Sequence, residues 1–164
     1  MGRQSDRIGE QLEREVGMAC KALILQIDRN LRRSPGRGGT PVDTGHARAN
    51  WIPSIGTPTV LDTSVAQANA AHQQGVQQVI SFKLGDGVLY VSNGTPYIRK
   101  LNEGWSEQAA RLFVESCVDE AYATVEGRLR GRIQLGRSAF QDFVGSAGAE
   151  NLADAYNPFG GDDD

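Results

Sequence analysis

The chain has 164 residues, of which 39% are hydrophobic and 23% charged, enough apolar sequence for one packed core and one domain. No apolar run approaches the roughly 20 residues that span a bilayer, and the polar N-terminus lacks a signal-peptide pattern, so we expect neither a membrane partner nor secretion. Cys20 and Cys117 lie far apart in apolar helical contexts, which excludes a disulfide framework and indicates buried thiols in a reducing compartment.

The net charge of −3 is unevenly distributed along the chain. Residues 1–50 carry nine basic and six acidic side chains, whereas residues 101–164 carry five basic and twelve acidic ones. A basic front and an acidic back suit a subunit that stacks against its neighbours in an assembly. A solvated surface with an acidic tail would give the same pattern.

The first predicted element is a long helix over residues 5–33. Its apolar residues recur at steps of three and four: Ile8, Leu12, Val16, Ala19, Leu23, Ile27 and Leu31. Pro35 and Gly36 end it, and a glycine-rich loop that carries Arg37 follows.

Shorter elements follow this loop. Asp43 or Thr44 can cap a helical turn over residues 46–48, and a short strand with Pro53 inside it begins at Trp51. A proline within a strand indicates an edge strand or a bulge.

A second helix is predicted to start after a cap among residues 62–64. Alternating apolar residues at 79–84 and 88–92, on either side of a glycine-rich turn, predict a β-hairpin. A third helix is predicted over residues 107–130, and beyond Ile133 glycines interrupt any periodicity.

The predicted fold class is therefore α+β, with a long N-terminal helix and a C-terminal helix packed on a small antiparallel sheet. We expect residues 1–132 to form a single α+β domain. Residues 133–164 are expected to form an extended, glycine-rich, acidic C-terminal arm that docks onto a neighbouring molecule or stays mobile.

The sequence contains few residues suited to catalysis. It lacks the glycine motifs that hold phosphates and the signatures of zinc proteases and serine hydrolases. His46 could act as a base oriented by Asp43, or a histidine could activate Cys20 or Cys117. The stronger interpretation is that His46 bonds locally or faces a neighbouring molecule, and that His72 is a surface or boundary residue in the middle of a helix. We therefore expect no enzymatic activity, no cofactor and no metal.

Two stretches of the sequence resemble a known family. Residues 40–51 read TPVDTGHARANW, and residues 89–109 read LYVSNGTPYIRKLNEGWSEQA. Together, in this order, they resemble the neck or tail-completion proteins of long-tailed bacteriophages. These are the small minor tail proteins of the lambda Z-like group, which lie at the head–tail junction.

The resemblance implies a structural virion protein in the tail or neck, assembled in the host cytoplasm. Such a subunit would form a homo-oligomeric, six-fold ring that joins the tail to the head connector around the DNA channel. Its partners would be the tail terminator or tail tube and the head-closure or connector proteins. A tail terminator or head-closure protein of the same junction is the alternative, and a small cysteine hydrolase is a more distant one.

An assembly role directs attention to turns, aromatic side chains and charges as candidate subunit-interface residues. The three arginines at the end of the first helix could pair with the acidic residues of a neighbour or make weak, salt-dependent contact with DNA in the channel; the acidic C-terminal third favours the subunit seam. The candidates are Arg32, Arg33, Arg37, Asp43, Thr44, Trp51, Tyr97, Trp105, Glu115, Asp119 and Glu120.

Overall fold

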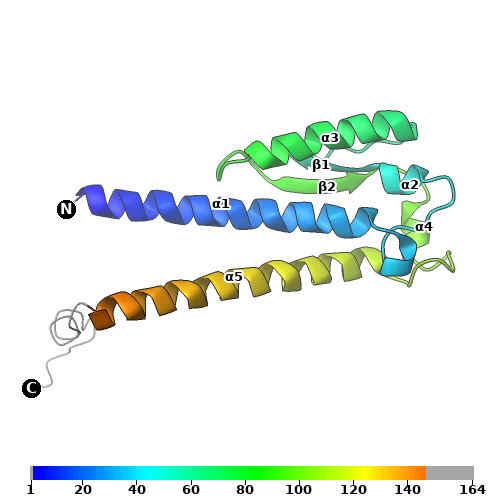
Figure 1. Cartoon of the computed structure of the whole chain (residues 1–164). Coiled ribbons are helices and arrows are strands. Elements are labelled where there is room, and N and C mark those ends of the chain that lie inside the picture. Colours follow the sequence, from blue (N-terminus) through cyan, green and yellow to red (C-terminus); the bar gives the residue numbers. More distant parts are fainter. Residues whose placement is uncertain (1, 147–164) are drawn as a thin grey trace, which may run out of the picture. The chain divides into compact units, whose positions relative to one another are not determined.

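The computed structural model describes residues 2–146, with side chains placed for residues 6, 7 and 9–131 (Figure 1). The chain divides into two compact units, Met1–Glu126 and Gly127–Asp164. The elements are α1 (Gly2–Arg32), the 3-10 turn η1 (Pro35–Arg37), α2 (His46–Ala49), β1 (Trp51–Ile55), α3 (Val65–Ser81), β2 (Leu89–Asn93), α4 (Ile98–Asn102) and α5 (Phe113–Ser146).

The two strands form one antiparallel pair, in which Trp51 lies opposite Asn93 and Ile55 lies opposite Leu89. Pro53 is accommodated because a two-stranded sheet leaves each strand one unpaired edge. Both faces of β1 are nonetheless buried, since α1 and α3 both pack against it. Figure 1 shows the sheet lying between α3 and α1.

The contact between α3 and β1 depends on a glycine. A Cβ atom at Gly75 would collide with the backbone carbonyl of Pro53, so the helix backbone lies directly on the strand. The start of α3 is fixed by Ser64, whose hydroxyl oxygen accepts a hydrogen bond from the backbone N–H of Gln67 at 3.4 Å. Of the three positions at which the sequence predicted the cap, residues 62–64, it is therefore the last that caps α3.

The core of the first unit joins α1, β1 and the beginning of α5. Its buried cluster consists of Leu31, Trp51, Phe113 and Cys117. The side chain of Asn30, also buried, donates to the backbone carbonyl of Cys117 at 2.9 Å, which ties α1 to α5. The prediction of an α+β fold with long N- and C-terminal helices and a small antiparallel sheet is confirmed.

The predicted β-hairpin is wrong. Residues 79–81 complete α3, and β2 pairs with β1 instead. Val79 is fully buried in the apolar stripe of the helix, which outweighs the short alternation that suggested a strand. Gly85 and Gly87, at φ angles of 105° and 121°, form the connection to β2.

The C-terminal helix begins later and ends later than the sequence indicated. The side chain of Asn102 reaches the first turn of α5, where its oxygen accepts from the N–H of Val114 at 2.9 Å, and this cap explains the start at Phe113. Residues 133–146 are helical, so the prediction of an extended arm is wrong over that range. The glycines there do not prevent a helix, because each costs only about 1 kcal/mol relative to alanine. Residues 147–164 of the expected arm lie outside the described residues.

No helix within the part of the chain that the structure describes is both long and apolar enough to cross a membrane.

The close approach of α3 to β1 predicts opposite effects for two glycine substitutions. Gly75→Ala should lower the free energy of unfolding by about 2 kcal/mol, because the new methyl group meets the Pro53 carbonyl. Gly127→Ala, at a helical position with no atom near the new Cβ, should raise it by roughly 0.5–1 kcal/mol. Denaturant unfolding measures both, and a change of the same sign in the two variants would contradict the packing described.

Candidate functional site

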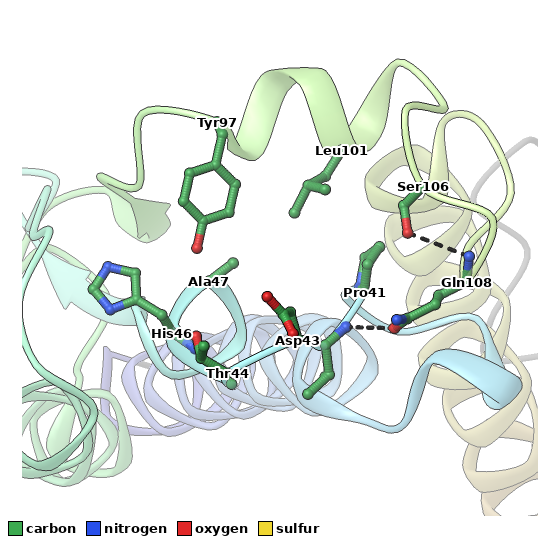
Figure 2. Close-up of a pocket in the computed structure, with 11 residues that line it drawn as sticks. Pro41, Asp43, Thr44, His46, Ala47, Tyr97, Leu101, Ser106 and Gln108 are labelled. Carbon is green, nitrogen blue, oxygen red and sulfur yellow. Dashed lines mark hydrogen bonds between the residues drawn. The ribbon is translucent and has the colours of Figure 1, made fainter.

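The two sequence stretches that carry the family resemblance meet around a pocket of about 250 Å³ (Figure 2). The first stretch contributes its turn and the start of α2, and the second contributes α4 and the loop after it. The lining residues are Pro41, Val42, Asp43, Thr44, Gly45, His46, Ala47, Tyr97, Leu101, Ser106 and Gln108.

Specific hydrogen bonds hold the two stretches together. The backbone N–H of Val42 donates to the side-chain oxygen of Gln108 at 2.8 Å, and the side chain of Asn93 donates to the carbonyl of Ala47 at 2.7 Å. The pairing of β1 with β2 adds a third connection. Segments that are far apart in the sequence therefore form one surface.

One side of the pocket is held by a pair of side chains that also connects it to the start of α3. His46 Nε2 lies 2.6 Å from Asp62 Oδ1. Thr63, which follows Asp62, is held by the buried side chain of Asn50. This side chain donates to the carbonyl of Thr63 at 3.0 Å and accepts from the N–H of Thr63 at 3.1 Å. His46 thus pairs with Asp62, 16 residues away, and not with Asp43 or with a group close to it in the sequence, as the sequence suggested.

Tyr97 covers the pocket from α4's N-terminal side, with its hydroxyl pointing down toward Ala47 (Figure 2). Burial raises the pKa of the Tyr97 hydroxyl, and the carboxylates of Asp62 and Asp43 raise it further. The phenol therefore stays neutral at physiological pH and acts as a hydrogen-bonding group.

The loop between α4 and α5 is an exposed wall of this site. Trp105 is 72% exposed, and the Lys100 ammonium lies 5.0 Å from the centre of its ring. Leu112, at the other end of the loop, has a φ angle of 62°, a strained value for a residue with a side chain. The N–H of Leu112 donates to the carbonyl of Asn102 at 2.7 Å, which holds the strained turn.

The groups that a cysteine hydrolase would need are not brought together. Burial raises the pKa of the Cys117 thiol, which donates to the carbonyl of Gly38 at 3.3 Å. His46 is occupied by Asp62, and His72 Nε2 lies 2.9 Å from Asp28 Oδ2. Within the described residues, moreover, no group of three or more His, Cys, Asp and Glu side chains could hold a metal ion.

Two of the arginines predicted at a subunit interface are used inside the chain. The Arg32 guanidinium donates to the carbonyls of Arg48 and Ala49, at 3.2 and 2.8 Å, and to the side chain of Asn69 at 3.0 Å. Desolvation lowers the Arg32 pKa, as its partial burial requires. These donors fasten the end of α1 to α2 and α3, so Arg32 has a structural role within the chain, and its place at a subunit interface stays a prediction.

Arg33 forms a bidentate ion pair with Glu120 of the same chain. Its two terminal guanidinium nitrogens lie 2.7 and 2.6 Å from the Glu120 carboxylate oxygens. We expected these two residues to pair across a subunit seam; they pair within one chain instead, because the path of α5 brings Glu120 to the end of α1. Arg37 is exposed on η1 and keeps its place as a candidate surface contact.

The other predicted residues divide between core and surface. Trp51, 6% exposed, belongs to the core, so its expected interface role is wrong. Glu115 accepts from the side chain of Asn102 at 2.9 Å. The rest are exposed: Asp43, Thr44, Tyr97, Trp105 and Asp119.

Sequence patterns did not identify three residues that hold the site together: Gln108, Asn93 and Asp62. The first two lie within the stretches that suggested the family, so their position was a usable signal. Nothing in the local sequence links Asp62 to His46, since that pairing depends on how the chain returns toward α3.

No family model, no curated protein and no solved structure matches this chain.

Replacing two neighbouring arginines should separate structural from surface roles. Arg32→Ala should lower the free energy of unfolding by about 2 kcal/mol, because the carbonyls of Arg48 and Ala49 lose a charged donor. Arg37→Ala, on the exposed turn, should change it by less than about 0.5 kcal/mol. Thermal or denaturant melting measures this difference, and equal stability of the two variants would rule out the fastening role.

The Arg33–Glu120 pair should make a pH-dependent contribution to stability. Its hydrogen bond to Arg33 holds the Glu120 pKa below the usual value of a glutamate, so the unfolded chain binds the proton more readily than the folded one. The stabilisation is present above the unfolded-state pKa and disappears as the pH falls through the folded-state pKa. Half exposure of Glu120 limits it to under about 1 kcal/mol.

Glu120→Gln should therefore be less stable than the parent at neutral pH and equally stable in strong acid. Asp119→Asn, which alters the exposed carboxylate next to Glu120, is the matched control. Unfolding curves at several pH values measure the difference, and a stability gap for Glu120→Gln that persists in strong acid would contradict the assignment.

Proposed function

We propose that this protein is a structural virion protein of a tailed bacteriophage, a neck or tail-completion subunit. In this role it forms a ring, with six-fold symmetry as the expected arrangement, that joins the tail to the head connector around the DNA channel. Its partners are further copies of itself, the tail terminator or tail tube, and the head-closure or connector proteins.

The observation that supports this proposal most directly is the meeting of the two resembling stretches. The N–H of Val42 bonds to Gln108, and Asn93 bonds to the carbonyl of Ala47. The two stretches that carry the resemblance therefore belong to one three-dimensional feature.

The surface around this feature suits contact with other proteins. Tyr97 is 42% exposed, Leu112 is 47% exposed, and Trp105 is the most exposed of the three. Aromatic side chains are favoured in protein–protein contacts because they supply a large apolar area with few rotatable bonds. Arg37 remains the candidate for weak, sequence-independent contact with DNA.

Two other functions were considered. The tail terminator and the head-closure protein occupy the same junction, and the resemblance favours tail completion over both. A cysteine hydrolase has less support, because the Cys117 thiol bonds to the carbonyl of Gly38 and both histidines are paired with aspartates.

Loss of the chain in its phage tests the proposal. A nonsense codon in the gene should lead to DNA-filled heads and complete tails that accumulate unjoined, and purified protein added to the lysate should join them into infectious particles. Electron microscopy and plaque counts measure the two effects. Tails of irregular length would indicate a terminator, heads that lose DNA would indicate a closure protein, and normal particles would end the proposal.

The same complementation assay examines the exposed loop. Trp105→Ala protein should restore joining less well than the parent, because the loop loses its largest exposed aromatic side chain. Val60→Ala, which truncates a side chain that is 62% exposed outside this loop, is the matched control.

A further inference from the structure

Asp43 places a carboxylate in the pocket without a partner. Figure 2 shows the carboxylate turned into the space below Leu101 and beside Ala47. Of the described residues, none forms a hydrogen bond or ion pair with this side chain. The neighbouring acid Asp62 differs, because His46 pairs with it at 2.6 Å.

Asp43 lies in the lining of the pocket, and Asp62 pairs with His46 of the same lining. The carboxylates of Asp43 and Asp62 both act on the Tyr97 hydroxyl, whose pKa they raise in addition to the effect of burial. The other ionisable side chain in the lining, His46, is paired with Asp62. The pocket therefore attracts cations and repels phosphates and carboxylates.

The walls are suited to a cation on an aliphatic stem. Pro41, Ala47 and Leu101 present apolar surface, which favours methylene groups, and Tyr97 presents an aromatic ring, which favours a positive charge. The volume of about 250 Å³ accommodates one such side chain. A bound metal ion would need more oxygen or nitrogen ligands than the single free carboxylate offers.

We propose that this pocket binds an arginine or lysine side chain presented by another protein molecule, with Asp43 as the ion-pair partner. The apolar walls cover the stem of that side chain, and its charged head lies between the Asp43 carboxylate and the ring of Tyr97. This inference does not depend on the proposed neck role. It assigns the pocket to a basic protein segment and not to nucleic acid.

Titration of the full chain with single amino-acid derivatives tests the proposal. N-acetyl-L-arginine amide should produce saturable shifts in the NMR signals of the backbone amides of Gly45, Ala47 and Gln108, with a Kd in the millimolar range. N-acetyl-L-citrulline amide, which has nearly the same shape but no charge, should bind about fivefold more weakly. The lysine derivative is expected to behave like the arginine derivative.

A substitution in the pocket completes the thermodynamic cycle. Asp43→Asn should weaken binding of the arginine derivative by about the same fivefold and leave citrulline binding unchanged, because the charge is lost from the pocket alone. The variant should fold, since the Asp43 side chain is exposed and bonds to no other side chain, and its melting curve verifies this. Asp119→Asn, which lies outside the pocket lining, is the matched control and should bind like the parent.

Equal affinity of the parent for the charged and neutral derivatives would overturn the proposal. So would an Asp43→Asn variant that binds the arginine derivative as tightly as the parent, or the absence of saturable shifts at the pocket amides.

Discussion

The indole of Trp51 is the contact on which the rest of the first unit depends. Its ring packs with Leu31, Phe113 and Cys117, which belong to α1 and α5, while its backbone pairs with β2. Its N–H donates to the hydroxyl of Thr40 at 2.8 Å, and that hydroxyl donates to the carbonyl of Leu31 at 2.7 Å. A buried indole N–H requires a partner, and here the partner also satisfies a carbonyl at the end of α1. The residues between Thr40 and Trp51 are therefore held at both ends, which positions the turn that lines the pocket.

Buried polar side chains determine how this turn meets the following segments. Asn50 bonds to both backbone groups of Thr63, and Arg32 supplies donors to the carbonyls at the end of α2. Each of these groups would cost free energy if it were buried without its partner, so the chain path is specified by hydrogen bonding as much as by apolar packing. The segments that form the pocket are consequently held by hydrogen bonds to their backbone groups.

The sequence predicted the elements with strong periodicity and missed the relations between them. The apolar stripe of α1, the cap at Ser64 and the strand at Trp51 follow from local patterns. The hairpin was wrong because residues 79–84 fit both a helix end and a strand, and only the burial of Val79 decides between them. The pairing of Arg33 with Glu120 and of His46 with Asp62 depends on the tertiary path, which charge patterns cannot supply. The family resemblance did identify the segments that line the pocket, but not that they touch.

The folded chain also changes the meaning of its charge distribution. The excess of basic side chains in residues 1–50 suggested a surface that pairs with the acidic C-terminal third of a neighbouring subunit. Within the chain, however, Arg33 pairs with Glu120, and Arg32 donates hydrogen bonds to backbone carbonyls. Residues 1–50 also contribute Asp43 to the pocket. The loop between α4 and α5, which exposes Trp105, contributes Ser106 and Gln108 to the same lining. That loop ends at the strained backbone of Leu112, whose N–H donates to the carbonyl of Asn102 at the end of α4. A partner that inserts a basic side chain beside Asp43 would also lie against Ser106 and Gln108, which this loop contributes to the pocket lining, so affinity and orientation would come from adjacent parts of one surface.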